Sequence, residues 1–265
     1  MLSSLSPQRR RFVVALTGIV AVALVVTATA FVRSRPEPVV PVSQSTPGPV
    51  LLVPGYGGST DALEVLASAL RDAGRDATVV TLAGDGTGDL REQAKVLDDA
   101  VQTTLSATGA TSVDVVGFSA GGVIAREWVA NFGGGSIARR VVTLGSPQHG
   151  TDVASLAAAV TPNSCPTACK QLQPDSDLLR GLNSGDETPV GPVWVSMWST
   201  SDQLVVPPES AALEGGVNFS VQSVCGPQEI DHGNLPRTPS VIALTLFALD
   251  EVVPVVPDPE ACRVR

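Results

Sequence analysis

The stretch that decides the fold is Val113–Gly122, which has the sequence VDVVGFSAGG and is followed directly by VIAREW. The β-branched residues at its start predict a buried strand, and the sequence after it predicts a helix. Between them lies a Gly-x-Ser-x-Gly motif centred on Ser119, so the order is strand, tight turn and helix, as a nucleophile elbow requires. Gly117 and Gly121 relieve the crowding of such a turn, whose serine is strained. Ser119 is therefore the predicted nucleophile.

The composition limits the class of protein. The chain has 265 residues, of which 43% are hydrophobic and 16% are charged, and its net charge is −9. This length suits one globular domain plus an appendage. The acidic balance argues against nucleic acid as a partner. Because the chain has two histidines, an acid–base histidine must be His149 or His232.

The first 35 residues differ from the rest of the chain. Three arginines at 9–11 precede an uncharged apolar run at 12–32, and ATA at 28–30 fits the cleavage site of a signal peptide. The run is also long enough to span a bilayer, which would leave the arginines in the cytoplasm. We therefore expect 1–32 to be a signal peptide or an N-terminal membrane anchor. In both cases the rest of the chain is extracytoplasmic, either secreted or attached to the membrane through 12–32.

The remainder divides into a spacer at 33–48, which is rich in proline, and a catalytic domain at 49–265. In the domain, short apolar strands alternate with helices, which predicts an α/β fold with a mostly parallel sheet of about six strands and helices on both faces. The expected strands are 50–53, 77–82, 112–116, 139–144, 192–197 and 217–224, and the expected helices include 61–74, 89–107, 120–132 and 238–250. The less regular part at 145–191 is expected to form the rim of a cleft at the carboxyl ends of the strands.

All four cysteines, Cys165, Cys169, Cys225 and Cys262, lie in the part that we expect to be exported. An even count there indicates disulfides, for which three pairings are possible. We favour Cys165–Cys169, which closes a short loop, together with Cys225–Cys262, which ties down the tail. A metal site is the alternative, but scattered cysteines without a neighbouring histidine lack zinc-ligand spacing. No metal ligand is predicted.

A serine nucleophile needs a base, and the base needs an orienting acid. His232 follows the last predicted strand and precedes the closing helix, where the base is expected. Asp202 follows the preceding strand and is the expected acid, which gives the chain order serine, aspartate, histidine. Asp231 is adjacent to the base and is expected to stay solvated. His149 precedes any candidate acid and is interpreted as a loop or cleft-wall residue.

An oxyanion hole requires two backbone N–H donors near the serine. Ala120, directly after the nucleophile, is one expected donor. Tyr56 is the other, because it lies in the glycine-rich loop VPGYGGST at 53–60, where the backbone can approach an acyl oxygen. A phosphate-binding loop is the alternative, but no Gly-Lys-Ser/Thr sequence follows.

With these residues placed, the chain resembles the α/β-hydrolase superfamily, and within it small secreted lipases and esterases of bacterial, actinobacterial type. The resemblance rests on LLVPGYGG at 51–58, GFSAGG at 117–122, LGSPQHGT at 144–151, SDQLVVP at 201–207 and DHG at 231–233. It implies a compact form of the fold and ester hydrolysis without a cofactor. Ser119, Asp202 and His232 are the implied triad, with Tyr56 and Ala120 as donors to the oxyanion.

Two residues depart from the pattern of that family. Pro54 and Phe118 stand where such lipases usually have histidine, although neither position is a catalytic group. We therefore predict an exported serine carboxylic-ester hydrolase, active as a monomer on a lipid or other acyl ester through an acyl-enzyme. The alternatives are a cell-envelope acyltransferase or thioesterase with the same triad, and a non-catalytic binding protein tethered to the membrane.

Overall fold

The computed structural model describes residues 39–160, 164–250 and 252–263, together with positions 8, 11, 16–18, 20, 23 and 24, which are helical. Residues 39–265 form one compact unit, and residues 1–38 form another. Most of the expected signal peptide or anchor at 1–32, and the spacer up to position 38, lie outside the described residues. Within the described part, no helix has the length and apolar character needed to cross a membrane.

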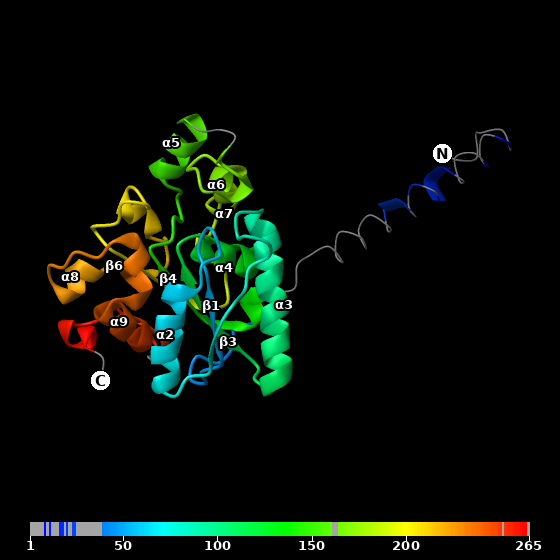
Figure 1. Ribbon diagram of the computed structural model, residues 1–265. Helices are drawn as coiled ribbons and strands as arrows, with labels where there is room; N and C mark the ends of the chain where they lie inside the picture. The colour runs from blue at the N-terminus through cyan, green and yellow to red at the C-terminus, as the bar shows by residue number, and fades with distance from the viewer. Residues whose placement is uncertain are drawn as a thin grey trace. The chain divides into compact units, whose positions relative to one another are not determined.

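A parallel sheet of six strands forms the centre of the larger unit (Figure 1). The strands are β1 (Val50–Val53), β2 (Ala77–Val79), β3 (Val113–Phe118), β4 (Ala138–Leu144), β5 (Val193–Trp198) and β6 (Val217–Ser220). Their order across the sheet is β2-β1-β3-β4-β5-β6, and every neighbouring pair is parallel. The predicted α/β fold with a parallel sheet of about six strands is confirmed.

Helices cover both faces of the sheet, because successive residues of a strand point to opposite sides. Helices α3 (Leu90–Thr108) and α4 (Ala120–Asn131) pack on one face, and α2 (Asp61–Asp72) and α9 (Pro239–Asp250) pack on the other. In β1, Leu51 and Val53 join the cluster with α3 and α4, whereas Val50 and Leu52 join the cluster with α2 and α9. Both faces are therefore buried, which explains why the strands are continuous apolar runs.

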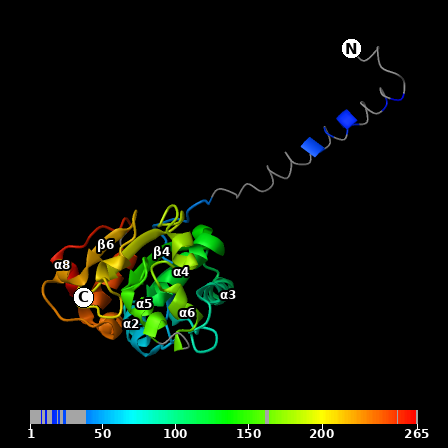
Figure 2. The same cartoon turned by 90° about the horizontal axis from the view of Figure 1, so that it is seen from above.

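The segment after β4 supplies short helices at the carboxyl end of the sheet. Further helices of the described part are α5 (Asp152–Val160), α6 (Thr167–Gln171), α7 (Asp177–Leu182), α8 (Val221–Cys225) and the 3₁₀ helices Gly134–Ser136, Pro208–Ala211, His232–Arg237 and Pro259–Cys262. Figures 1 and 2 show α5 and α6 together at one end of the domain. They belong to the part expected to form a rim.

Two strands are shorter in the structure than the sequence analysis predicted. The strand expected at 77–82 ends at Val79, and the strand expected at 217–224 ends at Ser220, where α8 begins. The Ser220 hydroxyl accepts a hydrogen bond from the backbone N–H of Ser223 at 3.1 Å. A serine in this position satisfies a free N–H of the first helical turn and therefore favours a helix start over continuation of the strand.

The last part of the predicted spacer contacts the domain. Its residue Gln44 accepts hydrogen bonds from two buried arginines of β4: Arg139 Nη1 donates to the backbone oxygen at 3.1 Å, and Arg140 Nη2 donates to the side chain at 3.3 Å. Arg139 also forms a bidentate ion pair with the buried Asp114 of β3, at 2.8 and 2.5 Å. Because buried polar groups need hydrogen-bond partners, the two contacts hold Gln44 against the sheet.

Both cysteine pairs that we favoured are disulfides in the structure. Cys165–Cys169 closes a short loop that includes the start of α6, and Cys225–Cys262 joins the end of α8 to the 3₁₀ helix Pro259–Cys262. The second bridge ties the C-terminal segment to the domain.

Candidate active site

Ser119 occupies the tight turn between β3 and α4. Its backbone angles are φ 54° and ψ −127°, and apart from glycines it alone among the described residues has a positive φ. This conformation is strained for a residue with a Cβ and persists only when the surroundings impose it. Here the Ser119 N–H donates to the carbonyl of Leu144, at the end of β4, at 2.9 Å. The turn therefore presents the serine at the carboxyl edge of the sheet.

Two glycines of the predicted elbow allow strand and helix to pass this closely. A Cβ on Gly117 would lie 2.5 Å from the Cα of Gly122, and a Cβ on Gly121 would lie 2.1 Å from the carbonyl oxygen of Val53. Both contacts are with backbone, which cannot move aside as a flexible side chain would. Glycine is thus required at both positions for steric reasons.

The structure brings together the three residues predicted from chain order. His232 Nε2 lies 2.8 Å from Ser119 Oγ, and His232 Nδ1 lies 2.6 Å from Asp202 Oδ2. The second carboxylate oxygen of Asp202 accepts from the backbone N–H groups of Leu204 and Val205, at 2.8 and 2.9 Å. Because a carboxylate only accepts, the proton of the neutral imidazole is on Nδ1, and the Nε2 lone pair faces the serine hydroxyl.

Local structure around His232 explains how the imidazole is held. His232 is the first residue of a 3₁₀ helix, and the Asp231 carboxylate accepts from the backbone N–H of Asn234 at 2.9 Å, which caps that helix. Asp231 thus has a role that the sequence reading missed. His232 is 7% exposed and Asp202 is 5% exposed, so water has little access to their hydrogen bond.

Of the two predicted oxyanion residues, Ala120 directly follows Ser119 in the chain, and Tyr56 directly follows a glycine that packs on Ser119. Ala120 is the first residue of α4, where backbone N–H groups have no partner within the helix. Tyr56 follows Gly55 in a tight turn that is closed by a hydrogen bond from the Gly58 N–H to the Gly55 carbonyl at 3.0 Å. A Cβ on Gly55 would lie 2.8 Å from the Cβ of Ser119, so this turn packs directly on the nucleophile.

His149 does not contact the serine but links two loops near the rim. Its Nε2 lies 2.8 Å from Glu187 Oε1, and its Nδ1 lies 3.2 Å from the carbonyl oxygen of Ser210. Burial disfavours the charged form of Glu187, but the hydrogen bond from the Glu214 N–H, the contact with His149 and the charge of Arg126 outweigh it, so the pKa of Glu187 is lowered. The interpretation of His149 as a loop residue agrees with this placement.

Arg126 is a buried charge of α4 that the sequence reading did not single out. Its guanidinium donates to the carbonyl oxygens of Glu187 and Leu182, at 2.6 and 2.8 Å, and to the Asn183 side chain at 2.6 Å. Burial lowers the pKa of Arg126 to about 10, against the opposing charges of Glu187 and Asp186. Arg126 thus stays charged at neutral pH and fastens the end of α7 to α4. The charged pair Arg126-Glu127 in an otherwise apolar stretch of helix is the signal that could have identified it.

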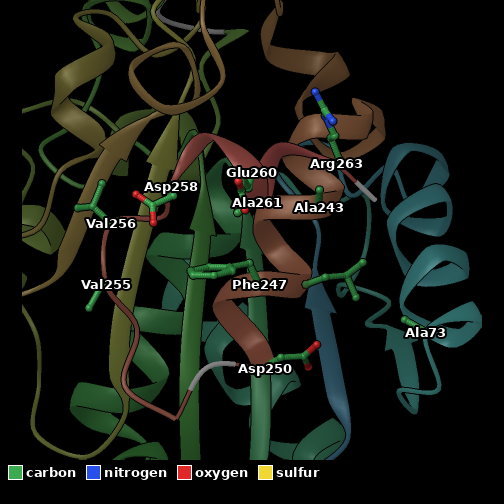
Figure 3. A pocket seen from close by; sticks show the side chains of 11 residues that line it. Ala73, Ala243, Phe247, Asp250, Val255, Val256, Asp258, Glu260, Ala261 and Arg263 are labelled. Carbon is green, nitrogen blue, oxygen red and sulfur yellow. The ribbon is translucent and has the colours of Figure 1, made fainter. Parts of the chain in front are cut away.

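A separate cavity of about 410 Å³ lies between α9, the end of α2 and the C-terminal segment. Figure 3 shows Phe247 and Asp250 from α9, Val255 and Val256 from the C-terminal segment, and Ala73 from the end of α2 around it. The serine, histidine and aspartate of the hydrogen-bonded chain are not among its lining residues. Because α2 runs antiparallel to the strands, its C-terminal end lies away from their carboxyl edge, and so does this cavity.

The parallel sheet, the strained serine turn and the histidine between the last strand and the closing helix are features of the α/β-hydrolase fold. The chain has the α/β-hydrolase fold, as its motifs predicted. The profile of the family Lipase (class 2) matches residues 92–221, just under half of the chain. That match includes Ser119 and Asp202 and ends before His232.

Solved structures of lipases and esterases share the fold. Bacillus licheniformis lipase BlEst2 in mature form has a TM-score of 0.64 and 18% identity, over 80% of this chain and 96% of that chain. Aspergillus fumigatus lipase B has a TM-score of 0.66 and 19% identity, over 85% of this chain and 57% of that chain. An esterase from Exiguobacterium antarcticum has a TM-score of 0.54 and 14% identity, over 78% of this chain and 93% of that chain. No curated protein sequence matches the chain.

Proposed function

We propose that the protein is a serine hydrolase of carboxylic esters, a lipase or esterase that works through an acyl-enzyme. The observation that carries the proposal is the chain of hydrogen bonds from Ser119 through His232 to Asp202, at 2.8 and 2.6 Å. A serine hydroxyl is a weak nucleophile, and an adjacent imidazole held by a carboxylate is the arrangement that activates it.

In the proposed mechanism, Ser119 Oγ attacks the ester carbonyl carbon while His232 Nε2 accepts the hydroxyl proton. Asp202 holds the imidazole and stabilises the imidazolium. The oxyanion of the tetrahedral intermediate accepts hydrogen bonds from the backbone N–H groups of Tyr56 and Ala120. The imidazolium then protonates the departing alkoxide, which leaves an acyl-enzyme. Water, deprotonated by His232, attacks this acyl group and releases the carboxylic acid.

An apolar surface at the rim supports a lipid ester as the substrate. Along α5, the side chains of Val153, Leu156 and Val160 are 36%, 64% and 70% exposed. Leu204, on the loop that carries the acid Asp202, is 54% exposed, and its carbonyl accepts from the Thr151 hydroxyl before α5 at 2.7 Å. Large apolar side chains that are exposed near a candidate catalytic centre favour binding of an acyl chain.

We also propose that the enzyme acts outside the cytoplasm as a monomer, with a catalytic domain at 49–265 after a spacer at 33–48. The two disulfides support an oxidising compartment. Export through 1–32, and any membrane association through 12–32, remain predictions from the sequence.

The test is hydrolysis of a short-chain and a long-chain acyl ester by the wild-type protein and by Ser119→Ala. We expect turnover by the wild type and a fall in kcat of more than about 10³-fold in the variant. The ratio between the two chain lengths separates lipase from esterase. Product analysis with an added alcohol, or with a thioester substrate, tests the acyltransferase and thioesterase alternatives. Wild-type protein that is inert on all these substrates would contradict the proposal.

A further inference from the structure

A glycine-rich loop at 83–88, between β2 and α3, packs against the loop that carries Tyr56. The Gly57 N–H donates to the carbonyl oxygen of Gly86 at 3.3 Å. Gly86 has a φ of 71°, and a Cβ at this position would lie 2.5 Å from the backbone nitrogen of Gly58. The two loops therefore meet backbone to backbone, without space for a side chain.

Tyr56 is thus held from both sides. Gly55, before it, packs on the nucleophile Ser119, and Gly57, after it, is bonded to the loop at 83–88. The position of the Tyr56 N–H relative to the serine is set by these two contacts together. A shift of 83–88 would therefore move the proposed oxyanion donor.

A buried glutamine of α3 fixes the start of this loop. Gln93 is 2% exposed, and its side-chain amide pairs with both backbone groups of Ala83. The Ala83 N–H donates to Gln93 Oε1 at 2.8 Å, and Gln93 Nε2 donates to the Ala83 carbonyl at 3.1 Å. The same carbonyl accepts from the Gly86 N–H at 3.2 Å. Gln93 therefore anchors the turn that presents Gly86.

Helix α6 holds the other end of the loop. The Ala168 N–H donates to the Thr87 carbonyl at 3.1 Å. Gln171, at the end of α6, accepts from the Leu90 N–H at 2.8 Å and donates to the Asp89 carboxylate at 2.7 Å. The loop at 83–88 is thus hydrogen-bonded to α3 at its start and to α6 at its end, which restricts its movement.

We propose that the loop at 83–88 is a buttress, that is a rigid support, for the loop at 53–60 that carries Tyr56 (the oxyanion loop). Gly86 and Gln93 are then positioning residues for the reaction. This inference rests on the proposed function, in which Tyr56 donates to the oxyanion. A donor stabilises the transition state only when it is placed where the negative charge develops. Displacing the donor removes an interaction made in the transition state, so it lowers kcat and leaves KM largely unchanged.

The decisive comparison is Gly86→Ala with Gly84→Ala in the full chain. Both glycines have a positive φ, 71° and 63°, so alanine is strained at either position. A Cβ on Gly84 meets nothing within 4 Å, whereas a Cβ on Gly86 meets the backbone of the oxyanion loop. Only Gly86→Ala should therefore displace Tyr56. Gln93→Met is the second test variant, because it keeps the side-chain volume and removes both hydrogen bonds to Ala83.

Two readouts are needed, of which one is independent of activity. Amide hydrogen exchange of 55–58 should be at least about tenfold faster in Gly86→Ala and Gln93→Met, and unchanged in Gly84→Ala. For a soluble short-chain ester, kcat should fall between about tenfold and a thousandfold in Gly86→Ala with KM within roughly twofold of the wild type. Gly84→Ala should keep kcat within roughly twofold.

The outcomes separate this proposal from the proposed function. Unchanged exchange of 55–58 in both Gly86→Ala and Gln93→Met would overturn the buttress, whatever the activity. Equal effects of Gly84→Ala and Gly86→Ala would overturn it as well, since strain alone would then explain them. Faster exchange in a protein whose wild type hydrolyses no ester would support the buttress and contradict the ester hydrolase.

Discussion

The ring of Phe118 lies beside the imidazole of His232, with ring centroids 5.0 Å apart and planes inclined at 33°. Phe118 is the last residue of β3, so the same turn carries both this ring and Ser119, the proposed nucleophile. The aromatic contact limits rotation of the imidazole out of line with Asp202. The residue before Ser119 thus provides an apolar support for the imidazole of His232.

We expect Phe118→Ala to lower kcat for a short-chain ester by up to about tenfold, because an aromatic pair is worth about 0.5–1.5 kcal/mol. KM should change little, since substrate binding is not the lost interaction. Phe118→His restores a ring and should recover most of the activity. Steady-state kinetics of the two variants measure this difference, and equal activities of both variants would show that the ring contact is irrelevant.

Replacing Asp202 by asparagine should lower kcat by about 10⁴-fold. The oxygen next to Leu204 and Val205 accepts two backbone N–H bonds, so the asparagine oxygen must take that place. The amide NH₂ then faces His232 Nδ1, which must become the unprotonated nitrogen. The proton moves to Nε2, and the imidazole no longer accepts from Ser119.

Asp231→Asn is the matched control for this change. Asp231 is adjacent to His232 in the chain, but its carboxylate caps a 3₁₀ helix, a role that asparagine also performs. We expect kcat within roughly threefold of the wild type. A large loss in Asp231→Asn together with a small loss in Asp202→Asn would exchange the roles of the two carboxylates.

Loss of the Cys225–Cys262 bridge should lower the free energy of unfolding more, whereas loss of the Cys165–Cys169 bridge should lower kcat more. Cys225–Cys262 joins residues 37 apart and Cys165–Cys169 joins residues 4 apart. Loop-closure entropy predicts losses of about 4 and about 2 kcal/mol on replacing each pair by serines. Only the short bridge stabilises α6, which holds the buttress loop, so its loss should lower kcat more. Urea unfolding of the two double variants tests the expected order of stability losses, and steady-state kinetics tests the expected order of kcat losses. A larger kcat loss without Cys225–Cys262 than without Cys165–Cys169 would contradict the link through α6.

Much of the fold and of the candidate site is local in sequence, which is why it could be predicted. The elbow around Ser119 needs only a strand, two glycines and a helix, all within one short stretch. Asp202 and His232 could be placed because each follows a strand of a parallel sheet, and all such ends meet at one edge.

The features that could not be predicted depend on contacts between residues distant in sequence or on competing local signals. The alternation at 217–222 fits a strand and continues past Ser220, and only the Ser220 cap decides that a helix starts within it. The role of Gly86 could not be predicted, because it arises from a backbone contact with Gly57 that no local pattern encodes. Arg126 resembles a solvent-facing helix residue until the end of α7 is seen to cover it.

Leu156→Asp tests the apolar surface on α5. Leu156 is 64% exposed, so the change should leave the free energy of unfolding nearly unaffected. We expect roughly tenfold weaker binding to phospholipid vesicles and a similar loss with an emulsified long-chain ester, because an apolar side chain no longer inserts. A soluble short-chain ester should be hydrolysed as before. Val253→Asp, at a 73% exposed position of the C-terminal segment, is the control and should change neither measurement.

The ionised Glu187 should stabilise the folded protein in a pH-dependent way. Burial opposes its charge, but the Glu214 N–H, His149 and Arg126 outweigh burial and hold the pKa of Glu187 below its ordinary value of 4.5. For an acid with a lowered pKa in the folded state, the added stability is complete above the ordinary value and is lost as pH falls through the lowered one.

Glu187→Gln should therefore be less stable than the wild type at pH 7, and the difference should shrink steadily below pH 4.5. Urea unfolding of both proteins at pH 7, 5 and 3 measures it. Asp177→Asn is the control, because the Asp177 side chain is 89% exposed in an ion pair with Arg180, and such surface pairs contribute little. A difference between Glu187→Gln and wild type that stayed constant from pH 7 to 3 would mean that the lost stability comes from packing or neutral hydrogen bonds. The charge of Glu187 would then play no part in holding the loops around His149 together.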